Sequence, residues 1–302
     1  MSTTPIISVV IPTYNRAKDL DRALKSVQAQ TYIHWEALIV DNNSDDSTDE
    51  VVIGFNDKRM KLFKINNNGV IAASRNMGID QSVGEYIAFL DSDDWWLPKK
   101  LEISLQYLQK GADIIYHDLF LVRNSGQKRF FRKTITYKLT TPVFDDLISK
   151  GNALTNSSVI VRKQILDSIN GLSEAPDLIA TEDYDAWLRI SKITDKFTRV
   201  NKSLGYYWVG GGNTNNLERQ LKAVNAIESR YSEEICNLKT SRSIYWLPYA
   251  KGRAYFKLRS FESSKKCLRS IQFFNAPIRL VFRAYLMRAE MIILKFLNSV
   301  QR

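Results

Sequence analysis

Cysteine and histidine are scarce in this sequence. Among 302 residues there are two of each: Cys236 and Cys267, and His34 and His117. Two cysteines outside any metal-ligand spacing predict neither a disulfide framework nor a zinc site, so a reducing, cytoplasmic location is expected. Neither histidine lies in a context typical of a catalytic base, and any chemistry of this chain is expected to use other side chains.

Long hydrophobic runs are also missing. Residues 6–11 form an apolar run, but Ser8 interrupts it and Pro12 ends it, so no signal peptide is predicted. The sequence contains no uninterrupted stretch of about 18 apolar residues that would span a bilayer. Any attachment to a membrane is therefore expected to be peripheral, at the inner face of the cell membrane.

Positive charge is concentrated in the last part of the chain. The formal net charge is +11, and residues 238–302 alone hold fourteen Lys or Arg against two Glu. The partner of this basic region is expected to be anionic. An anionic membrane surface is favoured, because aromatic and aliphatic residues lie between the charges. The alternative is a helical extension packed on the rest of the chain, whereas nucleic acid is not expected, because no known nucleic-acid-binding module accompanies the charge.

The first two thirds of the chain alternate short apolar runs with amphipathic stretches. Strands are predicted at residues 6–11, 36–40, 61–65, 86–90, 112–116 and 157–161. Helices are predicted at residues 18–30, 48–55, 71–81, 98–110, 143–150, 163–169 and 181–190. This order predicts an α/β fold with a mostly parallel sheet and helices on both faces. From about residue 217 helical periodicity dominates, with helices predicted at 241–274 and 277–300.

Polar residues follow four of the predicted strands, at residues 12–15, 41–44, 66–69 and 91–94. Ligands of parallel α/β sheets bind beyond the carboxyl ends of the strands, so these loops are expected to converge on one site. The last loop contains Asp91, Asp93 and Asp94, whose hard oxygen ligands suit Mg²⁺ or Mn²⁺ and, through it, a diphosphate. An acidic turn that caps the next helix is the alternative.

Five segments together resemble the family 2 glycosyltransferases of the GT-A fold, in the order and spacing of that family. They are IPTYNR at 11–16, VDNNSDDST at 40–48, GVIAASRNMG at 69–78, GEYIAFLDSDDW at 84–95 and Glu-Asp at 182–183. The resemblance covers roughly residues 5–210. It implies a GT-A catalytic domain over residues 1–216, with a nucleotide-sugar half at about 1–120 and an acceptor half at about 121–216. A basic α-helical region over 217–302 would follow.

The resemblance also implies roles for residues on the donor side. Asp93 would be the principal ligand of Mn²⁺ or Mg²⁺, with Asp91 nearer the ribose or behind the metal, and Arg75 would contact the diphosphate or position these acids. Asp41 would bind the nucleobase. The other residues expected to bind the nucleotide sugar are Pro12, Thr13, Tyr14, Asn15 and Ser92.

On the acceptor side, the family pattern assigns the catalytic base to Asp183, which would take the proton of the attacking hydroxyl. Glu182, Trp95 and Trp96 are expected near the acceptor, although core packing is equally expected for one of the two tryptophans. Helix-terminal acids without a catalytic role are the alternative for Glu182 and Asp183. The glycine-rich segment 206–216 is a candidate lid, but it lacks the His or Arg that the family often carries there.

The resemblance implies an inverting transferase that moves a sugar from a nucleotide diphosphate, a UDP-sugar in the first instance, to a hydroxyl of a glycan or lipid-linked acceptor. The expected setting is the assembly of lipopolysaccharide or another cell-surface polysaccharide. A non-catalytic glycan- or lipid-binding scaffold of the same fold is an alternative. A metal-dependent nucleotidyltransferase is another, but residues 12–16 lack the glycine-rich basic loop that such an enzyme requires.

Overall fold

The structure of this protein is a computed structural model. It describes residues 6–124, 126–127, 129–210, 216–238, 243–274 and 276–300, with side chains up to residue 294. The chain forms two compact units. Unit 1 comprises Met1–Phe144 and Asn152–Gly212, and unit 2 comprises Asp145–Gly151 and Asn213–Arg302.

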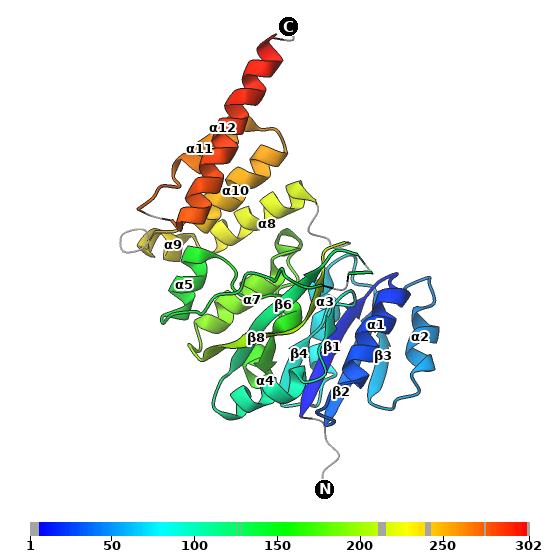
Figure 1. The fold of residues 1–302 in the computed structure, drawn as a ribbon. Helices are drawn as coiled ribbons and strands as arrows, with labels where there is room; N and C mark the ends of the chain where they lie inside the picture. Colours follow the sequence, from blue (N-terminus) through cyan, green and yellow to red (C-terminus); the bar gives the residue numbers. More distant parts are fainter. Residues whose placement is uncertain are drawn as a thin grey trace. The chain divides into compact units, whose positions relative to one another are not determined.

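Unit 1 is built on a mixed sheet, coloured blue to yellow-green in Figure 1. In their order across the sheet, the strands are β3 (Met60–Lys64), β2 (Trp35–Asp41), β1 (Ile7–Thr13), β4 (Tyr86–Phe89), β7 (Ile160–Arg162), β6 (Ile114–Val122), β8 (Phe197–Trp208) and β5 (Trp95–Trp96). The first four are parallel, β7 runs antiparallel to both of its neighbours, and β6 and β8 are parallel to each other.

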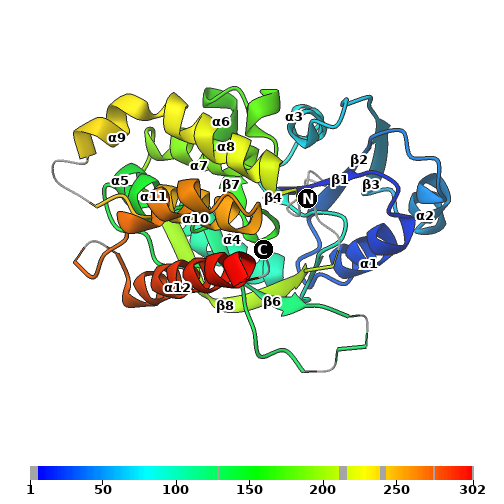
Figure 2. The ribbon, with the colours of Figure 1, turned by 90° about the horizontal axis from the view of Figure 1, so that it is seen from above.

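Helices cover both faces of the parallel half. Figure 2 shows α1 on one side of β1 and β2 and α3 on the other. The helices and 3-10 turns of unit 1 are α1 (Ala17–Gln28), α2 (Thr48–Gly54), α3 (Ile71–Asp80), α4 (Lys100–Gln109), η1 (Asn156–Ser158), α6 (Lys163–Ser168), η2 (Pro176–Leu178) and α7 (Glu182–Ser191). Because helices lie on both faces, every residue of β1 and β2 is buried, which explains why most of their residues are apolar on both faces. The buried polar exceptions are Ser8, Thr13, Glu36 and Asp41.

The apolar stripe of α1 forms one side of the core. Leu20, Ala23, Leu24 and Val27 are fully buried and belong to the same apolar cluster as Ile7, Val9 and Ile11 of β1. On the opposite face, α3 approaches the sheet so closely that a Cβ at Gly78 would lie 2.5 Å from Cγ1 of Val10. The glycine at 78 therefore permits this helix to pack directly on β1.

The predicted α/β class with a helical C-terminal part is confirmed, but the second half of the sheet differs from the prediction. The longest strand, β8, was not predicted, and neither was its short antiparallel partner β5. Residues 199–203 of β8 read Arg-Val-Asn-Lys-Ser, so the strand has no apolar run or regular alternation. Its strand conformation comes instead from hydrogen-bonded pairing with β6, and that pairing includes register shifts.

Unit 2 is α-helical. Its helices are α5 (Val143–Lys150, which joins this unit from Asp145 onward), α8 (Leu217–Arg230), α9 (Ser232–Leu238), α10 (Trp246–Lys257), α11 (Phe261–Arg269) and α12 (Ile278–Val300). The single helix predicted at 241–274 is broken, because Arg259 takes a left-handed φ of 57° between α10 and α11. Gly252 of α10 lies against Leu268 of α11, and Trp246 Nε1 donates to the Ile148 carbonyl at 2.6 Å.

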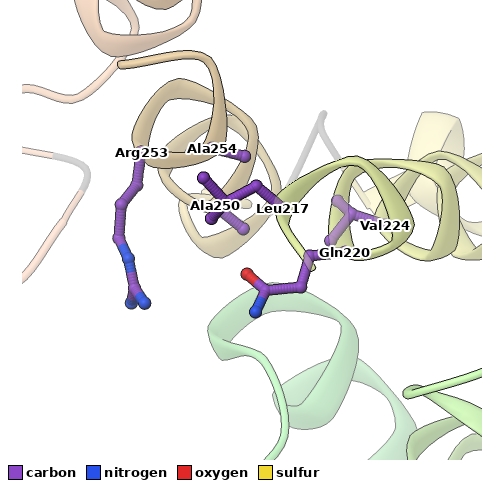
Figure 3. Close-up of a pocket in the computed structure, with 6 residues that line it drawn as sticks. All are labelled: Leu217, Gln220, Val224, Ala250, Arg253 and Ala254. Carbon is purple, nitrogen blue, oxygen red and sulfur yellow. The ribbon is translucent and has the colours of Figure 1, made fainter. Parts of the chain in front are cut away.

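A small hollow lies between α8 and α10 (Figure 3). Its lining is largely aliphatic and consists of Leu217, Gln220, Val224, Ala250, Arg253 and Ala254. A volume of about 80 Å³ is too small for a nucleotide sugar. Among the described residues, no helix combines the length and apolar character that crossing a bilayer requires.

Candidate active site

The four predicted polar loops meet where the parallel strands end. Thr13 pairs with Asp41 at the last position of the β1–β2 ladder, and the Thr13 carbonyl accepts from the Asn42 amide at 3.0 Å. The Asn67 amide, in the loop after β3, donates to Asn42 Oδ1 at 2.8 Å. Arg16, just after β1, reaches the loop that follows β4 through Asp93. The loops after β1, β2, β3 and β4 are therefore joined to one another, as the sequence predicts.

The acidic loop 91–94 is a tight turn with a fixed backbone. The Asp94 amide donates to the Asp91 carbonyl at 3.0 Å, and the Asp91 amide donates to Ser157 Oγ of η1 at 3.1 Å. Ser92 is buried within the turn. Asp91 and Asp93 keep part of their carboxylate surface exposed, with side-chain exposures of 28% and 17%. These two acids are therefore the ones that a ligand can reach.

Arg75 joins the acidic loop to the start of α7. Its Nη2 donates to Asp91 Oδ1 at 2.8 Å and its Nη1 donates to Glu182 Oε1 at 2.6 Å, while the side chain is 4% exposed. Burial alone would lower the pKa of Arg75, but the Asp91 and Glu182 carboxylates raise it above its usual value. The guanidinium is thus a permanent buried cation between the two predicted halves of the site.

Asp93 is paired with an arginine that sequence analysis did not single out. Arg16 Nη1 lies 2.6 Å from Asp93 Oδ2, and Arg22 Nη2 donates to the Asp93 carbonyl at 2.8 Å. Burial and the nearby Asp91 carboxylate raise the pKa of Asp93 to about 6, against the opposing effect of Arg16. Arg16 ends the motif IPTYNR, so its place in the sequence was the available signal.

The donor atoms of the acidic loop fit a divalent cation. Asp91 and Asp93 offer two partly exposed carboxylates, and burial together with the Asp91 charge raises the pKa of Asp93. Mg²⁺ and Mn²⁺ accept a few carboxylate ligands and fill their other positions with phosphate oxygens and water. Within the described residues, no group of three or more His, Cys, Asp or Glu side chains is arranged to hold a metal.

Asp94 is buried and ties the acidic loop to the end of β8. Its Oδ1 accepts from the Trp208 amide at 2.8 Å, and its Oδ2 has no hydrogen-bond partner. Burial, together with the Asp93 and Asp91 carboxylates, raises the pKa of Asp94 well above its usual range. The predicted lid segment begins at this strand end, but its residues 211–215 lie outside the described part of the chain.

The predicted nucleotide pocket is only partly open. Tyr14 is 55% exposed and Asn15 is exposed, whereas Pro12 and Thr13 are buried and Thr13 Oγ1 has no hydrogen-bond partner. Asn15 adopts a left-handed φ of 49°, its amide donates to Ser44 Oγ at 2.8 Å, and its Oδ1 accepts from the Asp45 amide at 3.0 Å. Asn15 therefore locks the loops after β1 and β2 together.

Asp41 is more enclosed than a residue that binds a nucleobase needs to be. Its side chain has no exposed area. Lys64 Nζ donates to Asp41 Oδ2 at 2.7 Å, and both the amide and the hydroxyl of Ser44 contact the carboxylate. A base would reach Asp41 only after Lys64 or Ser44 released an oxygen. Lys64 was not identified from the sequence, because its contact depends on the pairing of β2 and β3, whereas Ser44 lies only three residues from Asp41 in the same predicted polar loop.

Asp183 lies in the first turn of α7 and is the open acid of the Glu-Asp pair. Its Oδ1 accepts from the Tyr184 amide at 2.7 Å, and Asn152 Nδ2 lies 3.5 Å from its Oδ2. The carboxyl is only partly exposed. This desolvation and the Glu182 and Asp91 carboxylates raise the pKa of Asp183 to about 7, against the effect of Arg75. A carboxylate with such a pKa is well suited to accept a proton near neutral pH.

Glu182 requires a correction, because it does not face an acceptor. It is 6% exposed, and both of its oxygens are engaged. Arg75 donates to Oε1, and the Ala180 amide donates to Oε2 at 2.7 Å. Glu182 therefore fixes the start of α7, next to Asp183. Asp185, two residues beyond Asp183, is fully buried and paired with Arg189 at 2.8 Å.

The two tryptophans after the acidic loop have different surroundings. Trp95 is partly exposed, stacks on Tyr206 with ring centroids 5.0 Å apart, and lies under the Arg22 guanidinium. Trp96 is 3% exposed, and its Nε1 donates to the Ser157 carbonyl at 2.7 Å. The prediction that Trp96 contacts an acceptor is therefore wrong. Trp96 is a core residue that packs behind the acidic loop, which is the alternative expected for one of the two tryptophans. Trp95 stays a candidate.

Beneath Trp96 lie two buried ionisable groups. The Lys100 ammonium lies 3.7 Å from the centroid of the Trp96 ring, and burial lowers the pKa of Lys100 well below its usual range. Burial and the Lys100 charge lower the pKa of His117 to about 3, so this histidine is neutral at physiological pH. As the sequence suggests, His117 has a structural role.

Known proteins resemble this chain in sequence and in fold. The model of glycosyl transferase family 2 matches residues 8–166. An uncharacterized glycosyltransferase of Rickettsia conorii is 46% identical over 112 residues, which cover 37% of this chain and 18% of that protein. The UDP-Glc:alpha-D-GlcNAc-diphosphoundecaprenol beta-1,3-glucosyltransferase WfgD of Escherichia coli is 30% identical over 188 residues, which cover 62% of this chain and 70% of WfgD.

Among solved structures, the fold resembles S. aureus TarS 1-349 in complex with UDP-GlcNAc. The TM-score is 0.60 at 17% sequence identity, and the alignment covers 95% of this chain and 88% of that one. The region that matches the family model spans more than half of the chain. It contains Asp41, Arg75, Asp91 and Asp93. The chain belongs to glycosyl transferase family 2 and has the GT-A fold of that family.

Proposed function

We propose that this protein transfers a sugar from a UDP-linked donor to a hydroxyl of a glycan or lipid-linked acceptor, with inversion at the sugar carbon, during the assembly of a cell-surface polysaccharide. The observation that carries the proposal is the bridge made by Arg75. It connects Asp91, on the diphosphate side, with Glu182, whose neighbour Asp183 is the candidate base. One buried cation thus sets the position of both reacting halves of the site.

On the donor side, Asp91 and Asp93 would hold Mn²⁺ or Mg²⁺ against the diphosphate. When bound, such an ion supplies positive charge where the leaving diphosphate becomes more negative. Arg16, which pairs with Asp93 at 2.6 Å, would add a second positive charge on the diphosphate side of the site. Tyr14, Asn15 and the Asp41 region would hold the nucleoside.

On the acceptor side, Asp183 takes the proton of the attacking hydroxyl. Its raised pKa makes it a stronger base than an ordinary aspartate, and its partial exposure leaves room for the substrate. Asn152, at 3.5 Å from Oδ2, orients the carboxylate. Trp95 is partly exposed between Tyr206, on which its ring stacks, and the Arg22 guanidinium, and its exposed part would contact an acceptor sugar ring.

The names of two similar proteins support the substrate class. WfgD is named for a UDP-Glc donor and a lipid diphosphate acceptor, and the TarS structure contains UDP-GlcNAc. A lipid-linked acceptor also agrees with the basic region 238–302, which would bind an anionic membrane surface and keep the enzyme peripheral at the inner face of the cell membrane. The donor and acceptor classes are proposed on these grounds.

A screen of nucleotide sugars tests the proposal. The purified chain is mixed with UDP- and GDP-sugars, a lipid diphosphate sugar acceptor and Mn²⁺, and release of nucleoside diphosphate is measured with and without EDTA. We expect acceptor-dependent release from a UDP-sugar that EDTA abolishes and Mn²⁺ or Mg²⁺ restores. Donor binding without turnover in every combination would instead support the non-catalytic scaffold, and pyrophosphate as the product would support a nucleotidyltransferase.

A further inference from the structure

Helix α12 has one apolar face against the core of unit 2. Val281, Ala284 and Met291 are almost completely buried and belong to a cluster that includes Leu268 and Ile271. Their spacing of three and seven residues places them on one side of the helix. This face accounts for only part of the apolar residues of α12.

A second apolar face of the same helix is exposed. Six large side chains on this face have between 45% and 71% of their surface accessible: Ile278, Phe282, Tyr285, Leu286, Ile292 and Ile293. At 100° per residue they fall within one continuous stripe, which begins beside Val281 and lies farther from Ala284 and Met291. We call this set the α12 stripe. Its two-sided apolar character explains why the sequence of α12 does not look cleanly amphipathic.

The exposed surface continues into the loop before α12. Phe273 is 67% exposed and Phe274 is 84% exposed, and the ring of Phe273 stacks on Tyr285 with centroids 5.9 Å apart. Several large exposed side chains gathered in one place are unusual, because isolated exposed apolar residues are the norm on a protein surface. Such a surface indicates a partner.

Arginines border the stripe. Arg279 and Arg283 are exposed and lie next to it on the helix, and the Arg288 guanidinium lies 5.0 Å from the centroid of the Tyr285 ring. Glu290 is the sole acid of the sequence between Glu262 and Arg302. An apolar stripe with cationic margins is the pattern of a helix that lies in the plane of a membrane interface.

We propose that the α12 stripe docks on an anionic lipid bilayer, with its aromatic and aliphatic side chains in the interfacial layer and with Arg279 and Arg283 against lipid phosphates. This inference deepens the proposed function, because it names the surface through which the enzyme reaches a lipid-linked acceptor. The docking itself does not depend on catalysis and can be measured separately.

Charge favours a lipid surface over a second copy of this chain. Two stripes facing each other would bring together two copies of a region with fourteen basic residues and two acids. Like charges oppose that contact, whereas an anionic bilayer complements each arginine. The helix does not insert across the bilayer in this proposal, in keeping with the lack of a spanning helix among the described residues.

The test uses the full chain and vesicles sedimented or floated after mixing. Vesicles of phosphatidylglycerol and phosphatidylcholine in equal amounts are compared with vesicles of phosphatidylcholine alone. We expect binding to the former, with a partition constant that falls as salt is raised. Phe282→Ser with Leu286→Ser should weaken binding by on the order of tenfold or more, and Arg279→Gln with Arg283→Gln by roughly tenfold.

Matched controls come from unit 1. Ile53 is 73% exposed on α2, so Ile53→Ser removes a comparable apolar side chain elsewhere, and Lys18→Gln with Lys58→Gln removes two exposed charges. These variants should bind vesicles like the unmodified protein. Circular dichroism and thermal melting verify folding, and Ile278→Ser with Ile293→Ser replaces the first apolar pair if that variant does not fold.

Three outcomes would overturn the docking proposal: no preference for anionic vesicles, equal binding by stripe and control variants, or a dimer in the absence of lipid that the stripe variants convert to monomer. Sugar transfer to a water-soluble acceptor analogue separates this proposal from the proposed function. Stripe variants that lose vesicle binding but keep soluble turnover support both, whereas vesicle binding without turnover in the unmodified protein contradicts only the transferase.

Discussion

Arg75 and Glu182 form a buried ion pair of 2.6 Å between residues 107 positions apart in the sequence, and the same guanidinium binds Asp91. The pair connects α3 to the first turn of α7. Because Asp183 directly follows Glu182, any movement of the guanidinium displaces both the acidic loop and the candidate base. The site therefore depends on a residue that need not contact the acceptor.

Arg75→Lys should lower both turnover and stability, even though the substitution keeps the positive charge. A lysine offers a single ammonium group and cannot bridge two carboxylates in the planar geometry of a guanidinium. We expect turnover to fall by roughly 100-fold and the free energy of unfolding to fall by about 3 kcal/mol, because one buried carboxylate loses its partner. Enzyme assays and urea unfolding measure the two effects, with Lys18→Gln as the surface control. Wild-type turnover in Arg75→Lys would show that the bridge is not needed.

Asp94 provides a comparison between a lost charge and a lost hydrogen bond. Asp94→Asn keeps an acceptor oxygen for the Trp208 amide, whereas Asp94→Ala leaves that amide unpaired. We expect Asn to preserve stability within about 1 kcal/mol and Ala to destabilise the protein by about 1–3 kcal/mol, with a larger loss of turnover. Urea unfolding and steady-state kinetics compare the two variants. Equal losses in both would mean that the charge, not the link to β8, is what matters at this position.

The pH dependence of the reaction follows from the raised pKa of Asp183. Below about pH 7 its carboxyl is protonated and cannot accept the acceptor proton. We therefore expect kcat/KM to fall about tenfold for each pH unit on the acid side, with a midpoint above that of an ordinary aspartate. The residual activity of Asp183→Asn should not show this decrease of kcat/KM on the acid side. An acid limb near pH 4 in the unmodified enzyme would contradict the role of Asp183, since it would report an unperturbed carboxyl.

The parallel half of the fold could be predicted from the sequence because burial on both faces makes its strands continuously apolar. The runs 86–90 and 37–40 are examples, and their strands appear within a residue or two of the predicted ends. The second half could not be predicted in the same way. β8 carries Arg199 and Lys202, and its strand conformation depends on β6, a partner that is far away in sequence.

The candidate site was likewise only partly predictable from the sequence. Acidic residues at strand ends could be located from their position alone, and Asp91 and Asp93 are indeed the exposed acids of their loop. Which way a side chain faces could not be inferred. Trp96 packs into the core and Glu182 turns toward Arg75, since both directions are set by tertiary contacts with Ser157 and with α3.

Removal of the acceptor proton by Asp183 can be tested with a single pair of variants. Asp183→Asn and the exposed surface control Asp167→Asn are assayed for turnover with donor and acceptor, while binding of the UDP-sugar is measured by calorimetry. We predict donor affinity close to that of the unmodified protein for both variants, and turnover lowered about 100-fold or more for Asp183→Asn only. Unchanged turnover in Asp183→Asn would show that Asp183 is not the base that takes the acceptor proton.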